Sequence, residues 1–133
     1  MLNSMTLKDY MLPDPVRVRA EDDLSQAIRL IVQHRVSGLC VVDQEDHLVG
    51  VLSEMDCLKA IVAATYHDSG ARAKVRDHMT TEVQTCGPED HVVDVASDML
   101  RKGQRRRPVV EDRKLVGQIT CRQLLRVVIA YQG

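Results

Sequence analysis

Apolar residues recur at helical spacing in two stretches of the chain. The stretches cover residues 24–32 and 92–100, and in both the apolar positions follow i, i+3, i+4, i+7 and i+8. This spacing places those side chains on one face of an α-helix. We therefore predict two amphipathic helices with a buried stripe each. Asp22 or Asp23 is expected to cap the first helix and Asp90 the second.

Each predicted helix is followed by two short apolar runs around a polar turn. The runs cover residues 39–42 and 48–52 in the first half, and 108–110 and 115–119 in the second. Two such runs around a tight turn are typical of a β-hairpin. A further helix should follow each hairpin, and a short extended segment should precede each first helix. Each half of the chain thus reads strand, helix, strand, strand, helix.

The two halves are copies of one unit. A shift of 68 residues superimposes Asp9 on Asp77 and Met11 on Met79, and after the polar turn a shift of 67 superimposes Gly50 on Gly117. The repeats cover residues 7–66 and 75–131, with a linker at 67–74. A repeat of about 60 residues buries little surface alone, so we expect the two to pack together and share a core.

Composition excludes several classes of function. The 133 residues carry a formal net charge of −1 and only 2% aromatic residues, so neither a basic nucleic-acid surface nor a stacking platform for bases is indicated. The four cysteines form no C-x-x-C pair and the histidines are scattered, so we expect no metal site. No nucleophile–base motif, signal peptide or membrane span is recognisable, which favours a cytoplasmic protein that is not an enzyme.

Both hairpins run into their second helix through a hydroxyl residue. Ser53 is followed three residues later by Asp56, and Thr120 is followed by Gln123. The spacing favours a capping box, in which the hydroxyl and the later side chain bond to each other's backbone N–H groups. The same geometry also suits a ligand, because a helix N-terminus favours phosphate and a carboxylate there can accept two ribose hydroxyls.

The doubled pattern resembles a pair of CBS domains, named after cystathionine beta-synthase, over nearly the whole chain. The resemblance rests on the tandem repeat, on Pro-Val-Val at 108–110 and Cys-Val-Val at 40–42, and on Leu-Val-Gly followed by Ser53 or Thr120. It implies an α+β fold in which each repeat is β-α-β-β-α and the repeats pack about a pseudo-two-fold axis. It also implies a stand-alone regulatory (Bateman-type) module that binds an adenine-containing ligand: AMP, ADP, ATP, S-adenosylmethionine or NAD.

The family's ligand motif is complete in the first repeat only. By the resemblance, Ser53 would contact phosphate and Asp56 the ribose, whereas Thr120 is followed by Gln123, which cannot make the charge-assisted contact. We therefore expect the second site to be weaker or empty. The remaining residues implied to line the ligand are Val18, Val36, Ser37, Gly38 and Leu39 in the first repeat, and Arg105, Arg106 and Arg107 in the second.

The basic run of Arg101, Lys102 and Arg105–Arg107 allows three interpretations. It is a solvated helix end, a phosphate clamp beside the expected cleft, or a nucleic-acid patch, the last disfavoured by its shortness.

The function predicted from these observations is a ligand-sensing module that acts on an unidentified partner protein. The alternative is a structural or protein-interaction module without nucleotide. The helices after Ser53 and Thr120 are expected to form a homodimer, as the family resemblance implies. Candidate contacts, which instead could belong to the core, are Met55, Leu58, Ile61, Leu125 and Val128.

Overall fold

The chain divides into two compact units in the computed structural model, which describes residues 5–67 and 73–132. Residues Val16–Val83 form the unit that we call the N-unit. Residues Met1–Pro15 and Gln84–Gly133 together form the C-unit. Each repeat therefore gives its leading segment to the unit that contains the other repeat.

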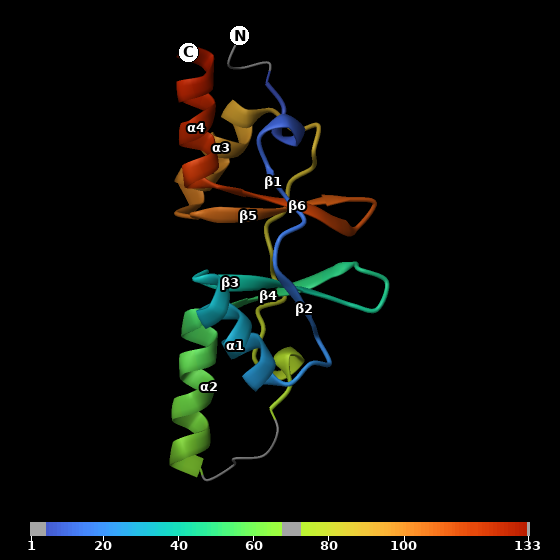
Figure 1. Cartoon of the computed structure of the whole chain (residues 1–133), viewed down its shortest axis with the longest axis vertical. Coiled ribbons are helices and arrows are strands. Elements are labelled where there is room, and N and C mark those ends of the chain that lie inside the picture. Colours follow the sequence, from blue (N-terminus) through green and yellow to red (C-terminus); the bar gives the residue numbers. More distant parts are fainter. Residues whose placement is uncertain (1–4, 68–72, 133) are drawn as a thin grey trace. The chain divides into compact units, whose positions relative to one another are not determined.

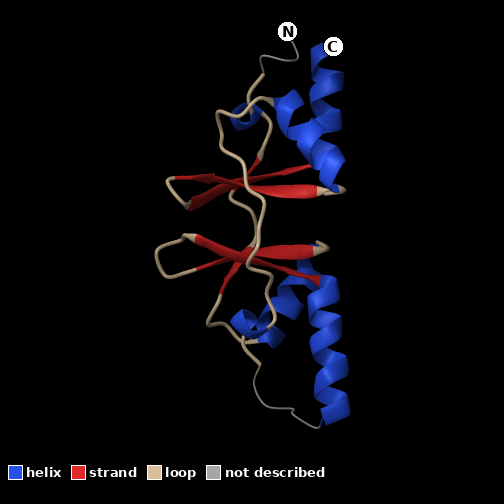
Figure 2. Cartoon of the chain, turned by 180° about the vertical axis from the view of Figure 1, so that it is seen from behind, coloured by secondary structure: helices blue, strands red, loops and turns tan. Residues whose placement is uncertain are grey.

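The N-unit is a three-stranded sheet with two helices on one face (Figure 2). The strands lie in the order β2-β3-β4, with β2 parallel and β4 antiparallel to β3. Along the chain the elements are β2 (Arg17–Arg19), α1 (Leu24–His34), β3 (Gly38–Val42), β4 (Leu48–Ser53), α2 (Glu54–His67) and the 3-10 turn η3 (Val75–Asp77). The predicted order of strand, helix, hairpin and helix is confirmed in this unit.

The C-unit repeats the design with a different edge strand (Figure 1). Its sheet has the order β1-β6-β5, and all pairings are antiparallel. The elements are η2 (Leu7–Asp9), β1 (Leu12–Pro13), α3 (Val92–Lys102), β5 (Arg106–Glu111), β6 (Lys114–Thr120) and α4 (Cys121–Gln132). The extended segment expected near residues 83–86 is reduced to a single parallel bridge between Cys86 and Val109.

Each repeat's leading segment, which we call the exchanged segment, supplies a backbone acceptor at the start of the first helix of the other repeat. These carbonyls, rather than aspartate side chains, accept hydrogen bonds from the first N–H groups of α1 and α3. The N–H of Leu24 donates to the carbonyl of Ala73 at 2.8 Å, and the N–H of Val92 donates to the carbonyl of Met5 at 2.8 Å. Neither Asp23 nor His91, the N-cap residues, makes a side-chain cap bond. The predicted aspartate caps are therefore wrong, because backbone from the exchanged segment already satisfies these first-turn donors.

The aspartates expected as caps close the preceding turn instead. Asp22 accepts the N–H of Arg19 at 2.9 Å, and Asp90 accepts the N–H of Gly87 at 2.8 Å. Both bonds span three residues, and they occur at equivalent positions of the two repeats. Aspartate favours such local bonds to the backbone, which compete with capping.

The buried residues form two clusters, one in each unit. One cluster lies in the N-unit around Val41 and Leu52, and the other lies in the C-unit around Val109 and Ile119. Each cluster also contains a residue from the leading segment of the other repeat. Val75 of the second repeat is fully buried in the first cluster, and Leu7 of the first repeat is fully buried in the second.

The helix stripes are narrower than predicted. Leu24, Ala27 and Ile31 are buried in α1, but Val32 is 71% exposed, and its equivalent Leu100 in α3 is 82% exposed. Position i+8 lies about 80° around a 3.6-residue helix from position i, so it leaves the buried face. Two exposed apolar residues result where the spacing predicted core.

The glycine of each Leu-Val-Gly motif makes room for an edge segment. A Cβ on Gly50 would lie 2.8 Å from the carbonyl oxygen of Thr80, and one on Gly117 would lie 2.6 Å from the sulfur of Met11. Val51 and Thr80 exchange two backbone hydrogen bonds, of 3.0 and 2.8 Å, at this place. The motif therefore has a structural cause that is independent of any ligand.

Candidate functional site

The helix start at Ser53 is a complete capping box. The N–H of Ser53 donates to Oδ2 of Asp56 at 2.9 Å, and the N–H of Asp56 donates to Oγ of Ser53 at 3.0 Å. The capping prediction is thus confirmed. Ser53 ends β4 and Asp56 lies in the first turn of α2, so the hairpin and the helix fix both side chains.

This capping box leaves part of both side chains for another molecule. Ser53 Oγ acts as an acceptor in the box, so the box does not use the hydroxyl hydrogen. The carboxylate of Asp56 accepts through Oδ2, and its second oxygen lies outside the box. Both side chains are only partly buried. The helix start therefore offers one hydroxyl donor and one carboxylate acceptor side by side.

The start of β3 lies directly against this helix start. Gly38 is the sheet partner of Ser53, and the N–H of Glu54 donates to the carbonyl of Ser37 at 2.9 Å. A Cβ on Gly38 would lie 2.9 Å from the carbonyl oxygen of Leu52, so a larger residue does not fit there without a shift. The structure thus brings together Ser37, Gly38, Ser53 and Asp56, as the resemblance implied.

The apolar residues assigned to this site lie deeper in the N-unit. Val18 and Leu39 are each 3% exposed and belong to its core, and the half-buried Val36 packs against that core. They stabilise the sheet in this structure, and their role in lining a base stays a prediction.

The equivalent place in the C-unit has a different bonding pattern. The N–H of Gln123 donates to Oγ1 of Thr120 at 3.2 Å, and the Thr120 hydroxyl donates to Oε1 of Gln123. The side chain of Gln123 is buried, with 7% exposure. The hydroxyl hydrogen of Thr120 is therefore used in a bond within the unit, whereas the capping box at Ser53 leaves the equivalent hydrogen available. No carboxylate is present at position 123.

Two of the three predicted arginine ligands lie beside Thr120. Arg106 is its sheet partner, and the carbonyl of Arg105 accepts the N–H of Cys121 at 3.0 Å. Arg105 is exposed and Arg106 is half-buried. Arg105 matches Ser37 of the first repeat and Arg106 matches Gly38, so the two helix starts differ in charge as well as in hydrogen bonding.

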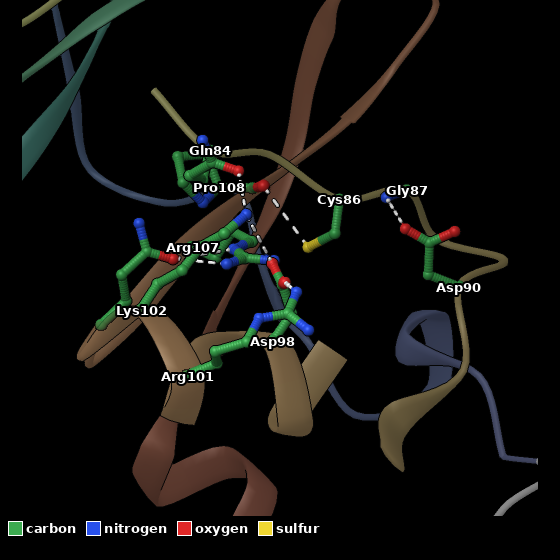
Figure 3. A network of polar contacts seen from close by, with 10 residues as sticks. Gln84, Cys86, Gly87, Asp90, Asp98, Arg101, Lys102, Arg107 and Pro108 are labelled. Carbon is green, nitrogen blue, oxygen red and sulfur yellow. Dashed lines mark hydrogen bonds and ion pairs between the residues drawn. The ribbon is translucent and has the colours of Figure 1, made fainter. Parts of the chain in front are cut away.

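Arg107 is held inside the C-unit (Figure 3). The side chain is 5% exposed, and one terminal nitrogen lies 2.8 Å from Oδ2 of Asp98. Its Nε and second terminal nitrogen donate to Oε1 of Gln104. A phosphate contact from Arg107 would require these bonds to break, so the structure disfavours the clamp interpretation for this residue.

Asp98 is the centre of this network. Lys102 lies 3.0 Å from its carboxylate and Arg101 also contacts it, so the helix-end interpretation of these two exposed residues is confirmed. The hydrogen bond from Lys102, followed by that from Arg107, lowers the pKa of Asp98 to about 2. The carboxylate is thus charged at neutral pH.

Sequence reasoning missed the pairing of Asp98 with Arg107, although the repeat carried the signal. A shift of 68 places these two residues on Leu30 and Leu39. Leu39 is buried in the N-unit core and Leu30 packs against that core. A charged pair therefore occupies in one unit the place that an apolar pair occupies in the other.

Three of the four free cysteines are buried, as Cys40 was expected to be. Burial raises the pKa of the Cys86 thiol to about 12. Burial, together with the charges of Asp56 and Glu54, also raises the pKa of Cys57. Cys121, at the start of α4, is exposed.

Two hollows lie at equivalent places of the two units, and their linings are distinct from the helix start at Ser53. One, of about 590 Å³, is lined in part by Arg17, Asp22 and Asp46, and an ion pair of 2.7 Å joins Arg17 to Asp46 across it. The other, of about 250 Å³, includes Cys86 and Arg107 in its lining. Neither lining contains Ser53 or Asp56, so these hollows do not define the candidate site.

Helices α2 and α4 each expose an apolar face. Leu58 is 54% exposed and Leu125 is 66% exposed, so the alternative that these residues belong to the core is wrong. Among the side chains that the structure describes on these two helices, the other exposed large apolar residues are Met55, Ile61, Val62, Val128, Ile129 and Tyr131. No helix within residues 5–67 and 73–132 is long and apolar enough to cross a membrane.

The CBS domain model matches residues 7–63 and 75–130, so the chain belongs to the CBS domain family. The fold is that of a tandem CBS pair. It resembles CBSX2, whose crystal structure in complex with AMP has a TM-score of 0.84 and 28% identity and covers 96% of this chain and 98% of that one. CBSX2 is a CBS-pair protein from Arabidopsis thaliana.

A second similar structure is the CBS domain pair of the protein MJ0100, solved with 5′-methylthioadenosine and S-adenosyl-L-methionine. Its TM-score is 0.78 at 25% identity, with 93% of this chain and 99% of that one covered. Among curated relatives, inosine-5′-monophosphate dehydrogenase of Methanocaldococcus jannaschii is 34% identical over 120 residues, 89% of this chain. This chain spans 22% of that enzyme and 42% of the uncharacterized protein MJ1225 from the same organism, so whole-protein activities do not transfer from them.

Proposed function

We propose that the chain is a regulatory module that senses an adenine nucleotide or adenosyl ligand at the helix start formed by Ser53 and Asp56. The candidate ligands are AMP, ADP, ATP, S-adenosylmethionine and NAD, and none of them is an obligatory cofactor. The observation that carries the proposal is the capping box, which leaves a hydroxyl hydrogen and a carboxylate oxygen at one helix N-terminus. The adenosyl ligands bound by two similar CBS pairs support it.

Each group has a distinct role in this proposal. The carboxylate of Asp56 accepts the ribose hydroxyls in charge-assisted hydrogen bonds. The hydroxyl of Ser53 and the partial positive charge of the α2 N-terminus stabilise a phosphate or another anionic group. Gly38 has no Cβ, so β3 can lie close to the end of β4 beside Ser53.

The C-unit site is proposed to be the weaker of the two. Thr120 donates its hydroxyl to Gln123, so a ligand there must first break an internal bond. Arg105 and Arg106 remain beside it and would attract an anion. Occupation of this site therefore depends on phosphate more than on ribose.

A calorimetric panel over the five ligands tests the proposal. At least one ligand should bind, and Asp56→Asn should weaken it by about tenfold or more, because the amide keeps a capping acceptor but loses the charge. Asp90→Asn is the matched control, because Asp90 of the C-unit accepts the N–H of the residue three positions earlier, as Asp56 does, at 2.8 Å. Gln123→Ala should weaken binding much less than Asp56→Asn.

Two outcomes oppose the proposal. Equal loss of affinity in Asp56→Asn and Gln123→Ala contradicts the assignment of the site. A null result with all five ligands favours the alternative function, a protein-interaction module, for which the exposed apolar faces of α2 and α4 provide the specific observation. Retained far-UV circular dichroism in each variant shows that the comparison concerns folded protein.

We further propose that the chain forms a homodimer through helices α2 and α4 and that ligand binding alters its contact with a regulated protein. Large exposed apolar patches mark interaction sites in soluble proteins. Met55 lies inside the capping box and is 61% exposed, so the ligand site and the docking face share the first turn of α2. A ligand can act on the partner only if it prefers one of two states.

A further inference from the structure

The larger of the two hollows lies where strands β2 and β3 of the N-unit end. Its volume is about 590 Å³, a size typical of small-molecule sites, and its lining includes the buried Val18 and Val42. Strands β2 and β3 are parallel, and ligands of open sheets bind outside the carboxyl ends of such strands. The pair of Gly38 and Ser53 lies at the opposite end of β3, and the β3–β4 turn lies away from α2 (Figure 1). The hollow is therefore separate from the proposed adenosyl site.

Two charged side chains of this hollow have no ionic partner among the described residues. Arg17 and Asp46 also line it, but they pair with each other at 2.7 Å. Arg19 and Asp22 form no ion pair within residues 5–67 and 73–132, although the N–H of Arg19 donates to Oδ2 of Asp22 at 2.9 Å. The two acidic neighbours of Asp22 in the sequence both pair with cations of the exchanged segment. Arg19 is thus available to an anion and Asp22 to a cation.

Asp43 adds a second carboxylate from the turn between β3 and β4. Its Oδ1 accepts the N–H groups of Glu45 and His47, at 2.8 and 2.9 Å, so the turn fixes the side chain. The backbone hydrogen bond from His47 lowers the pKa of Asp43, which keeps the carboxylate charged at neutral pH. Nδ1 of His47 lies 3.5 Å from Oδ2, but an imidazole is uncharged well above pH 7. In that range the hollow offers one guanidinium and two carboxylates to a ligand.

The second repeat lacks the features that build this hollow. A shift of 68 places Arg19 on Gly87, and it places Arg17 on an uncharged threonine. The hairpin turn is also one residue longer in the first repeat, with residues 43–47 in place of residues 111–114. The equivalent hollow of the C-unit measures about 250 Å³. Because the C-unit folds without these features, the fold alone does not account for them.

We propose that the hollow at the ends of β2 and β3 binds a free basic α-amino acid, such as arginine or lysine. The carboxylate and the α-ammonium of an amino acid share one carbon, and Arg19 and Asp22 are likewise held together by their backbone bond. A guanidinium can form two parallel hydrogen bonds with a carboxylate. The side-chain cation, several bonds away, then meets Asp43 on the neighbouring turn. One guanidinium and two carboxylates thus complement the one carboxylate and two cations of the ligand.

Calorimetric titration at pH 8 without an adenosyl ligand tests this site, with L-arginine as the probe. L-Arginine should bind. Agmatine, which lacks the carboxylate, and L-citrulline, which lacks the side-chain charge, should each bind about tenfold more weakly or worse. Equal affinity for the three compounds overturns the proposal. So does the absence of binding of both L-arginine and L-lysine at about 10 mM.

A pair of variants tests the role of Arg19. Arg19→Gln should weaken L-arginine by about tenfold or more but change agmatine little, because agmatine lacks the carboxylate that Arg19 contacts. Arg29→Gln removes an exposed charge of α1 outside the lining, so it is the matched control and should bind L-arginine like the unaltered chain. Equal loss in both variants, with far-UV circular dichroism retained, overturns the proposal. Every change lies outside residues 53–56, so a failure here leaves the adenosyl proposal untouched.

Discussion

Replacing Asp98 with leucine should destabilise the C-unit more than any other change to its charged network. The guanidinium of Arg107 lies 2.8 Å from Asp98, and the residue is 4% exposed. Without Asp98, the acceptor that remains for the guanidinium among the described residues is Oε1 of Gln104. Leaving a buried charge without its partner costs about 3–5 kcal/mol of unfolding free energy.

The opposite replacement, Arg107→Leu, should cost less. Asp98 keeps Lys102 at 3.0 Å and Arg101 as partners, and its side chain is 22% exposed, so solvent and these cations still compensate the carboxylate. The double variant Asp98→Leu/Arg107→Leu should lie within about 1 kcal/mol of the unaltered chain or be more stable, as is found when buried ion pairs are replaced by apolar ones. The N-unit supplies the template, because Leu30 and Leu39 pack at the equivalent positions.

Urea unfolding of the four chains, followed by circular dichroism, measures the cycle, and hydrogen exchange of α3 amides shows that the effect lies in the C-unit. The loss of unfolding free energy in the double variant should be much smaller than the sum of the losses in the two single variants. Equal losses in both single variants with a double variant equal to their sum would refute the reasoning.

The same pair predicts how acid affects stability. The pKa of Asp98 is lowered from 3.8 to about 2, so its contribution is present above pH 4 and is lost as the pH falls towards 2. The double variant should lose less stability than the unaltered chain over this interval.

Three further predictions concern packing and reactivity. Gly50→Ala should lower the free energy of unfolding of the N-unit in urea by about 1–3 kcal/mol, because the added Cβ would lie 2.8 Å from a backbone oxygen. Gly87→Ala is the control and should be nearly neutral, since the nearest atom to its Cβ lies at 3.8 Å. Equal effects of the two changes would contradict the close-approach argument. Leu7→Ala should cost about 2–5 kcal/mol and raise hydrogen exchange in α3 rather than α1, because Leu7 is buried in the C-unit; faster exchange confined to α1 would be inconsistent with the exchanged segment. Iodoacetamide should modify Cys121 well before Cys86, which is buried with a pKa of about 12, as mass spectrometry of digested protein can show; early labelling of Cys86 would oppose its buried placement.

Much of the fold could be predicted from the pattern of apolar positions. Local periodicity determines which residues form each helix and hairpin, and both repeats carry the same pattern. Periodicity does not show which segment packs on which sheet, and so the exchange of the segments that hold Leu7 and Val75 was missed. That exchange also explains the wrong caps, since Ala73 and Met5 occupy the donors assigned to aspartates.

The candidate site was predictable to the same extent. A short local motif placed Ser53 and Asp56 correctly, because the capping box is formed within four residues. The role of Arg107 was not predictable from its neighbours in sequence, because its partner Asp98 lies nine positions earlier on a helix. Comparison of the two repeats, which shows leucine at both equivalent positions, is the signal that reveals the pair.

Asp56 is proposed to hold the ribose of an adenosyl ligand. Calorimetric titration of the tightest ligand of the panel and of its 2′-deoxy form, with the unaltered chain and with Asp56→Asn, tests it most directly. Loss of the 2′-hydroxyl should weaken binding to the unaltered chain by about tenfold or more, as expected for a hydrogen bond to a charged group, but should change binding to the variant little. An equal loss in both proteins, or no loss in either, would contradict the claim.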